Sequence, residues 1–321
     1  MNKKHFNLFV RIFCAAILFA VMLLYVINSK RYAQATLTGL KLWATTVLPS
    51  LLPFFFFTAL FTATGVSVLF IKAFKRPAKI LFNADGILIY IRIMSLISGY
   101  PVGAKIISDL YLGGVISKEQ AKKYALSTST SGPIYVVGTV AISLFNSPKL
   151  GAVLLISHYL SSLLNGIIFR KLPDNGLIAP LLQNKADSVL YNAMFNAVTT
   201  LTVLGGFIAV FYTLSQMALD YNILSPLIKV LSPVYGDELS RAFVLGLIEC
   251  TSGCKAISVL PLTDKAVCTA AQIIAFGGVS VWCQTMAYLK KANVSFLWFA
   301  ISKIVQTITV YPICYILLKA V

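Results

Sequence analysis

Long apolar runs separated by short polar stretches dominate the chain. Runs of membrane-spanning length cover about 6–28, 47–71, 124–146, 150–170, 188–219, 265–289 and 294–319. They predict an all-α polytopic membrane protein with about seven transmembrane helices. Two further segments, 87–112 and 241–260, are apolar at both ends but interrupted in the middle. We expect each of them to form a re-entrant hairpin that enters and leaves on the same side.

The interruption of the first hairpin reads SGYPVGAK, from Ser98 to Lys105. Proline lacks a backbone donor and glycine permits backbone angles that end a helix. An unpaired backbone group costs several kcal/mol in hydrocarbon, so irregular backbone survives there only where protein or a wet cavity satisfies it. A second break, STSTSGP at 127–133, follows in the next apolar run. Both breaks therefore predict a ligand site.

The first hairpin has a partner 150 residues further along the chain. Residues 103–108 and 253–258 share the pattern G-x-K-x-I-S. The apolar run that follows the second copy is also interrupted, by the stretch AFGGVSVWCQ at 275–284. Three crossings separate equivalent elements, so the second copy is expected to be inverted, as in many secondary transporters. The predicted domains are an N-terminal transmembrane helix (1–34), a first repeat (35–170), a cytoplasmic linker (171–187) and a second, inverted repeat (188–321).

Composition and charge agree with a protein in the lipid bilayer. Hydrophobic residues make up 58% of the 321 positions and charged residues only 12%. The net charge of +17 comes from small groups of Lys and Arg at the ends of apolar runs, which is typical of membrane anchoring and argues against nucleic acid as a partner. With the N-terminus inside, the clusters at 72–79, 118–123, 170–185 and 290–291 all fall in the cytoplasm. The basic residues at 30, 31 and 41 are the exception, because they are expected outside.

Two lysines and one acid carry the candidate chemistry. Lys105 and Lys255 follow the two hairpin tips at matching repeat positions. A single lysine in a span usually snorkels to the surface, but a symmetric pair beside helix N-termini suits an anion such as a carboxylate. Glu249 is the most deeply placed acid. It has three interpretations: it pairs with Lys255, binds a coupling ion such as H⁺ or Na⁺, or accepts a hydrogen bond from the ligand.

The candidate substrate-binding residues come from the two tips and the two interrupted helices. They are Ser98, Gly99, Tyr100, Pro101, Gly103, Lys105, Ser129, Ser131, Gly132, Glu249, Thr251, Ser252, Gly253, Lys255, Gly278, Ser280 and Gln284. No cofactor or metal is expected, because the two histidines stand apart and the six cysteines lack the paired spacing of a zinc or disulfide framework.

Several stretches resemble one family. WATTVLPSLLPFFFF (43–57), SGYPVGAK, SGP (131–133), GLIECTSGCKAIS and FGGVSVWCQ are similar to the sporulation integral membrane protein YlbJ family, which belongs to the nucleoside-recognition or Gate-domain membrane proteins. The likeness runs from about Trp43 to the C-terminus. CTSGCK departs from it, since the family pattern has Asn and Gly after the glutamate.

The resemblance implies a multi-pass protein of the bacterial cell membrane, in the outer forespore membrane of endospore formers. It implies transport of dipicolinic acid, and a distant relation to concentrative nucleoside transporters. The leading hypothesis is alternating-access transport of a small organic anion, with a nucleoside or nucleobase as the alternative substrate. An intramembrane enzyme and a sporulation scaffold are the rival classes. An enzyme would have only Glu249 and hydroxyl groups as candidate catalytic side chains. Whether the protein forms oligomers is left open.

Overall fold

In the computed structural model, residues 3–63, 66–178 and 188–320 are described, and they form helices and no strand. The all-α membrane class is confirmed. Four helices in the described residues are long and apolar enough to span a bilayer, or up to six if each of two bent helix pairs is one span. This is fewer than the seven predicted. Residues 179–187 of the linker predicted at 171–187 lie outside the described residues.

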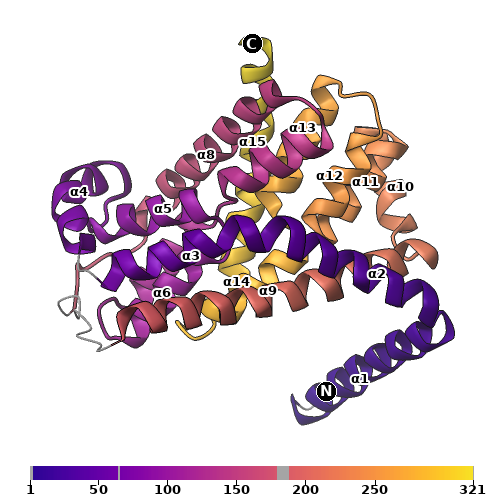
Figure 1. Ribbon diagram of the computed structural model, residues 1–321, viewed down its shortest axis with the longest axis horizontal. Helices are drawn as coiled ribbons and strands as arrows, with labels where there is room; N and C mark the ends of the chain where they lie inside the picture. The colour runs from indigo at the N-terminus through magenta and orange to yellow at the C-terminus, as the bar shows by residue number, and fades with distance from the viewer. Residues whose placement is uncertain (1–2, 64–65, 179–187, 321) are drawn as a thin grey trace.

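The N-terminal part and the first half of the chain contain eleven elements (Figure 1). They are α1 (Lys3–Ile27), α2 (Ser29–Leu42), η1 (Trp43–Val47), α3 (Leu48–Ala63), α4 (Val66–Phe82), α5 (Ile87–Ser98), α6 (Val102–Leu112), α7 (Lys118–Thr128), η2 (Ile134–Leu144), α8 (Pro148–Ile168) and η3 (Phe169–Lys171).

The second half has the same order of elements. They are α9 (Val189–Asp220), α10 (Ser225–Tyr235), α11 (Asp237–Ile248), α12 (Cys250–Ser258), α13 (Asp264–Phe276), α14 (Gly278–Leu289) and α15 (Phe296–Ala320). In each half a long helix is followed by a short helix, a hairpin of two helices, an interrupted helix and a final long helix. Each copy of G-x-K-x-I-S lies within the second hairpin helix, at residues 103–108 of α6 and 253–258 of α12. The domain boundaries and the inverted orientation of the second half stay predictions.

The helices α2, η1 and α3 follow one another directly and pack along the length of α9 (Figure 1). The apolar run predicted as one span at 47–71 is divided between α3 and α4. The chain also bends by 91° between residues 70–82 and 87–98. Basic side chains occur on α4 at 72, 75, 76 and 79, whereas Ile71, Ala78 and Phe82 are buried. This pattern is typical of a helix lying in the membrane interface.

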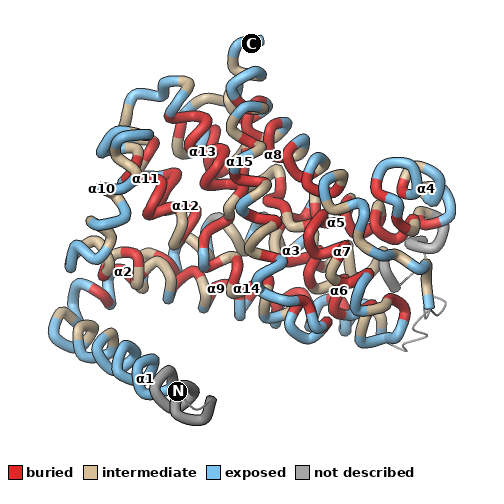
Figure 2. Tube along the Cα trace, turned by 180° about the vertical axis from the view of Figure 1, so that it is seen from behind, coloured by how far each residue is buried: buried red, intermediate tan, exposed pale blue. Residues whose placement is uncertain are grey.

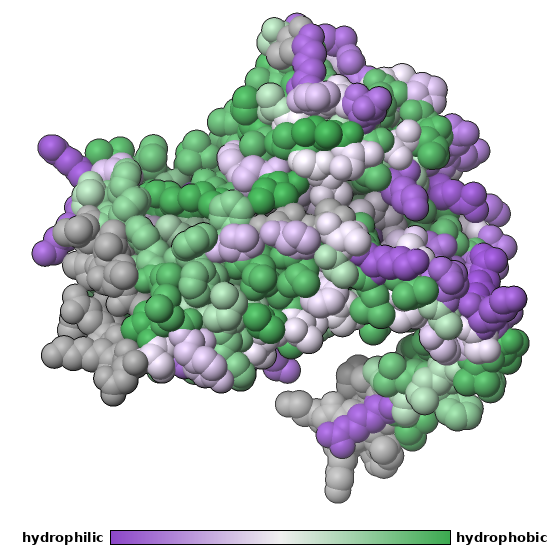
Figure 3. Space-filling view, in the orientation of Figure 1, coloured by the Kyte–Doolittle hydropathy of each residue, from purple (hydrophilic) through white to green (hydrophobic). Residues whose placement is uncertain are grey.

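Buried side chains concentrate in the interrupted helices and in the long helices that cover them. Figure 2 shows buried segments along α11, α12, α13 and α15, while α1 is mostly exposed. Hydrophobic side chains cover much of the face seen in Figure 3, and hydrophilic ones gather toward its margins. An apolar outer surface fits contact with lipid, because lipid tails are the solvent on that side.

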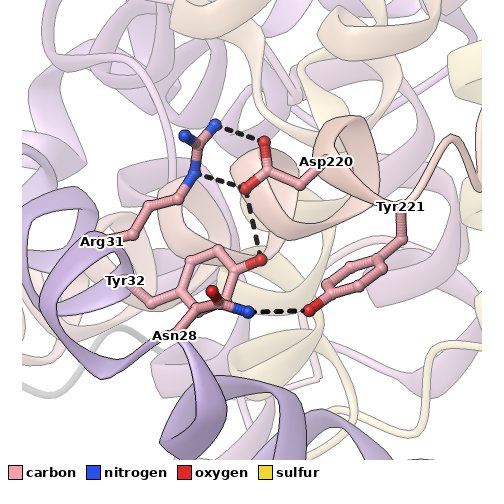
Figure 4. Close-up of polar contacts among 5 residues, drawn as sticks. All are labelled: Asn28, Arg31, Tyr32, Asp220 and Tyr221. Atoms are coloured by element: carbon pink, nitrogen blue, oxygen red, sulfur yellow. Dashed lines mark hydrogen bonds and ion pairs between the residues drawn. The ribbon is translucent and has the colours of Figure 1, made fainter.

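A polar cluster joins the turn between α1 and α2 to the end of α9 (Figure 4). Arg31 donates from Nε to Asp220 Oδ2 at 2.5 Å and forms an ion pair with the same carboxylate. Tyr32 donates to Asp220 Oδ2 at 3.2 Å, and Asn28 donates to the hydroxyl of Tyr221 at 3.0 Å. This gives a counter-ion to Arg31, one of the three basic residues that form the exception in the charge pattern. Its counter-ion, Asp220, is the last residue of α9.

Glycine allows the two helices of the second hairpin to approach closely. A Cβ atom added at Gly253 on α12 would lie 2.4 Å from the Cα atom of Gly246 on α11. At Gly103, the equivalent position of the first hairpin, it would lie 2.0 Å from the hydroxyl of Ser95. A side chain can rotate away but a backbone cannot. The two glycines of the repeated motif are thus packing positions.

We expect Gly253→Ala to destabilise the protein by about 1–3 kcal/mol, because backbone must move to admit the methyl group. Gly103→Ala should have a smaller effect, since only Ser95 must rotate. Gly206→Ala on α9 is the matched control, because a Cβ atom there would meet nothing within 4 Å. Thermal unfolding in detergent measures all three. A Gly253→Ala protein as stable as Gly206→Ala would contradict the packing role.

Candidate substrate cavity

One large cavity lies among the breaks of both halves. It encloses about 850 Å³, part of it open to the outside. Four places where a helix begins inside the protein contribute to its wall: Gly99 and Tyr100 before α6, Ser131 and Gly132 before η2, Glu249 to Thr251 at α12, and Gly277 and Ser280 at α14. The opposite wall is apolar and comes from the long helices, with Leu42, Val47, Leu51, Leu204 and Ile208. We call this the central cavity.

A smaller hollow of about 240 Å³ adjoins it, between α6, α7 and α14. Gly99 and Tyr100 line both spaces, so the first hairpin tip separates them. Its other wall residues include Pro101, Gly103 and Ser129. We call this the side cavity.

The structure brings together nine of the residues predicted from the sequence. Those lining the central cavity are Ser98, Gly99, Tyr100, Ser131, Gly132, Glu249, Thr251, Ser280 and Gln284. Pro101, Gly103 and Ser129 line the side cavity. Ser252, Gly253, Gly278, Lys105 and Lys255 line neither. The predicted site is therefore assembled from both halves, without its two lysines.

Both tip lysines point away from the central cavity. The ammonium of Lys105 lies 2.7 Å from Asp109 Oδ2, one helical turn further along α6. Lys255 is exposed. The geometry of the motif explains this. The motif glycine faces its partner helix, and a residue two positions later lies about 200° around the helix axis, since each residue advances about 100°. An anion in the central cavity meets neither ammonium in this arrangement.

The hydroxyl side chains at the first break, residues 127–131, have different roles. Ser127 and Thr128 donate to helix carbonyls of α7, at 3.1 and 2.8 Å. Thr130 donates to the carbonyl of Ser95 at 3.0 Å and so ties the break to the first hairpin. Of these hydroxyl residues, only Ser131 lines the central cavity. Most of the run stabilises backbone, and one residue faces the space.

The first hairpin tip and the first helix break touch through glycine. Gly99 has φ of +78°, a conformation that other residues rarely adopt. A Cβ atom there would also lie 2.5 Å from the amide nitrogen of Gly132. In the second half the break and tip meet in the same way, because a Cβ atom at Gly278 would lie 3.0 Å from the carbonyl of Ile248. Gly278 thus supports the wall without lining it.

The carbonyl ends of the breaks are covered by side chains. Arg92 donates to the carbonyl of Ser127, and Asn165 donates to that of Leu126 at 2.9 Å, both near the end of α7. Tyr159 donates to Leu96 O near the end of α5 at 2.5 Å. The indole of Trp282 donates to Phe276 O, at the end of α13, at 2.7 Å.

The N-termini of the helices that follow the breaks differ from these carbonyl ends. The first turns of α6, η2 and α14 carry no capping side chain. A helix N-terminus has unpaired N–H groups and about half a positive charge. The uncapped N-termini at the wall therefore offer N–H donors to the central cavity, while the Glu249 carboxylate brings a negative charge to the same wall.

Glu249 caps the fourth N-terminus. Its carboxylate accepts from the backbone N–H of Thr251 at 3.0 Å and from that of Ser252 at 2.7 Å, and the Ser252 hydroxyl donates to it at 2.8 Å. The side chain is 5% exposed. Of the three interpretations of Glu249, pairing with Lys255 does not occur in this structure. Its carboxylate instead stabilises the tip of the second hairpin.

Sequence reasoning missed a buried cation behind the wall. Lys303 on α15 is fully buried, and its Nζ lies 2.5 Å from the hydroxyl of Tyr100, 3.2 Å from Ser129 O and 2.8 Å from Gln306 Oε1. His158 is near the same break, where its Nε2 accepts from the Ser131 N–H at 2.9 Å. The sequence signal was a lysine in the middle of an apolar run, far from either end.

The chain is similar to sporulation integral membrane protein YlbJ of Bacillus subtilis. The two are 30% identical over 319 residues, an alignment that covers 89% of this chain and 76% of the relative. The chain belongs to the YlbJ family. No family model matches it, and no solved structure does. Membership in the YlbJ family, together with the spanning helices, makes it a multi-pass membrane protein related to sporulation.

We expect Glu249→Ala to lower thermal stability by about 0.5–2 kcal/mol, because it removes the acceptor that caps α12. Glu249→Gln should fall between Ala and the native protein, since one carbonyl acceptor remains. The control is Glu238→Ala, an exposed carboxylate in the first turn of α11. If both Glu249 variants unfold at the native temperature, the carboxylate is not a cap.

Proposed function

We propose that this protein transports a small organic anion across the membrane, and that the substrate is dipicolinic acid during endospore formation. One observation carries the proposal. Four helix N-termini from the two halves meet at one cavity, and three of them have no capping side chain. Such an arrangement binds anions through backbone N–H groups and dipoles. The resemblance to the YlbJ family supports the location in the outer forespore membrane.

The shape and lining of the cavity also suit this substrate. Dipicolinate has a flat aromatic ring with two carboxylates. The uncapped N-termini and Ser131 and Thr251 offer donors for the carboxylates, while Leu51, Leu204 and Ile208 offer an apolar surface for the ring.

Alternating access requires a path to each side of the membrane. The side cavity lies beyond Tyr100, toward the ends of α6 and α14, where the basic clusters at 118–123 and 290–291 are predicted in the cytoplasm. The first hairpin tip would then separate the substrate from the cytoplasm. A coupling ion, H⁺ or Na⁺, belongs to the same proposal, with Glu249 as the acid at the cavity.

A nucleoside or nucleobase is the second candidate substrate. Gln284 lines the central cavity, and its amide donates to the hydroxyl of Ser280 at 3.2 Å. An amide and a hydroxyl suit hydrogen bonding to a neutral base. Competition between the two ligand classes separates the candidates.

The test is uptake of radiolabelled dipicolinate into vesicles that contain the purified protein. We expect uptake that excess unlabelled dipicolinate abolishes and excess uridine or adenine leaves unchanged. Leu204→Trp should abolish uptake, because the indole fills the apolar wall. Val203→Trp is the matched control, one residue away on α9 and 53% exposed. No uptake by the native protein, or inhibition by nucleosides alone, would refute dipicolinate as the substrate.

A further inference from the structure

Lys303 is a buried cation without a counter-ion. It is 0% exposed, and no carboxylate forms an ion pair with it in the described part of the chain. Three oxygen acceptors surround its Nζ: the hydroxyl of Tyr100, the carbonyl of Ser129 and the amide oxygen of Gln306. Three acceptors match the three N–H groups of an ammonium, whereas a neutral amine has two.

A buried charge without a partner is unfavourable, and such charges are normally paired. Arg92, another deeply buried cation near the breaks, donates to the carbonyl of Ser127 at the end of α7 and to the carbonyl and hydroxyl of Ser162 on α8, and it packs over the ring of Phe82. Lys303 differs in one respect. One of its partners, Tyr100, is a side chain on a hairpin tip that lines the central cavity.

The position of Tyr100 makes it a removable partner. Its hydroxyl accepts from Lys303 and donates to Ser129 O at 3.3 Å, and its ring centre lies 5.0 Å from the Lys303 Nζ. Tyr100 thus contacts the ammonium and lines the central cavity, whereas Lys303 itself does not line it. Tyr100 also lines the side cavity.

Further polar atoms around Lys303 are unpaired. Ser129 Oγ, His158 Nδ1 and Gln306 Nε2 are buried and have no hydrogen-bond partner within the described residues. The hydroxyl and the amide nitrogen are donors. Each belongs to a residue that contacts Lys303 or the adjoining break. The region thus holds one unpaired charge and spare donors, which an anionic ligand would satisfy.

We propose that Lys303 is the residue that recognises the substrate carboxylate, and that the carboxylate binds by replacing the Tyr100 hydroxyl as its acceptor. Displacement of Tyr100 joins the central and side cavities. Anion binding and movement of the first hairpin tip are then one event. This inference rests on the proposed transport of an organic anion and names the residue that selects for its charge.

The experiment measures binding of dipicolinate to the purified full-length protein in detergent, by calorimetry and by ligand-dependent thermal stabilisation. We expect Lys303→Met to weaken binding about ten- to a hundredfold, the effect of losing a hydrogen bond to a charged group. Lys229→Met removes the same charge from an exposed site on α10 and should bind like the native protein. Lys255→Met tests the rival position at the second tip.

A second variant keeps the test decisive if Lys303→Met does not fold. Tyr100→Phe removes the competing acceptor and leaves the ammonium, so dipicolinate should bind more tightly than in the native protein. Equal or weaker binding by Tyr100→Phe would overturn the proposal. So would native affinity in Lys303→Met, or a loss confined to Lys255→Met. A native protein that binds no dipicolinate refutes the proposed function instead, which distinguishes the two failures.

Discussion

Backbone groups released by helix breaks inside a membrane must find partners in the protein, and the region around the cavity is organised by that requirement. Each break frees carbonyls on one side and N–H groups on the other. Here side chains such as Arg92, Asn165 and Trp282 occupy the carbonyl side. Most of the N–H side is left to the cavity. The N–H donors at the cavity wall are therefore a consequence of this unequal satisfaction at the breaks, and no cationic side chain is needed to supply them.

The two halves reach this arrangement by different means. In the second half, Glu249 supplies a local cap and two glycines bring the hairpin helices together. In the first half, contacts from other helices hold the tip: Tyr159 reaches it from α8 and Lys303 from α15. Local contacts hold the second hairpin together, whereas the first hairpin depends on contacts from other helices. The repeat in the sequence thus conceals a structural difference between the two tips.

Much of the fold could be predicted from hydrophobic patterning, because hairpins, interrupted helices and the repeat each leave a local signal. Nine candidate residues reach the cavity wall for the same reason: breaks are visible in sequence. The positions of the lysine side chains could not be predicted in this way. Lys105 and Lys255 stand beside the breaks, yet their rotation about the helix, set by the glycine two positions earlier, turns them outward. Lys303 stands in an uninterrupted helix, and its proximity to Tyr100 arises only when the two halves meet.

One contact across the halves has a practical consequence. The hydroxyl of Tyr135, at the first break, lies 3.1 Å from the sulfur of Cys250 at the second hairpin tip. Cys250 is a free, buried cysteine that lines the central cavity. Because the thiol is buried against Tyr135, its reaction with a water-borne reagent requires a change at this contact. The rate of labelling at Cys250 would therefore measure how often the contact between the two halves opens, with no cysteine introduced.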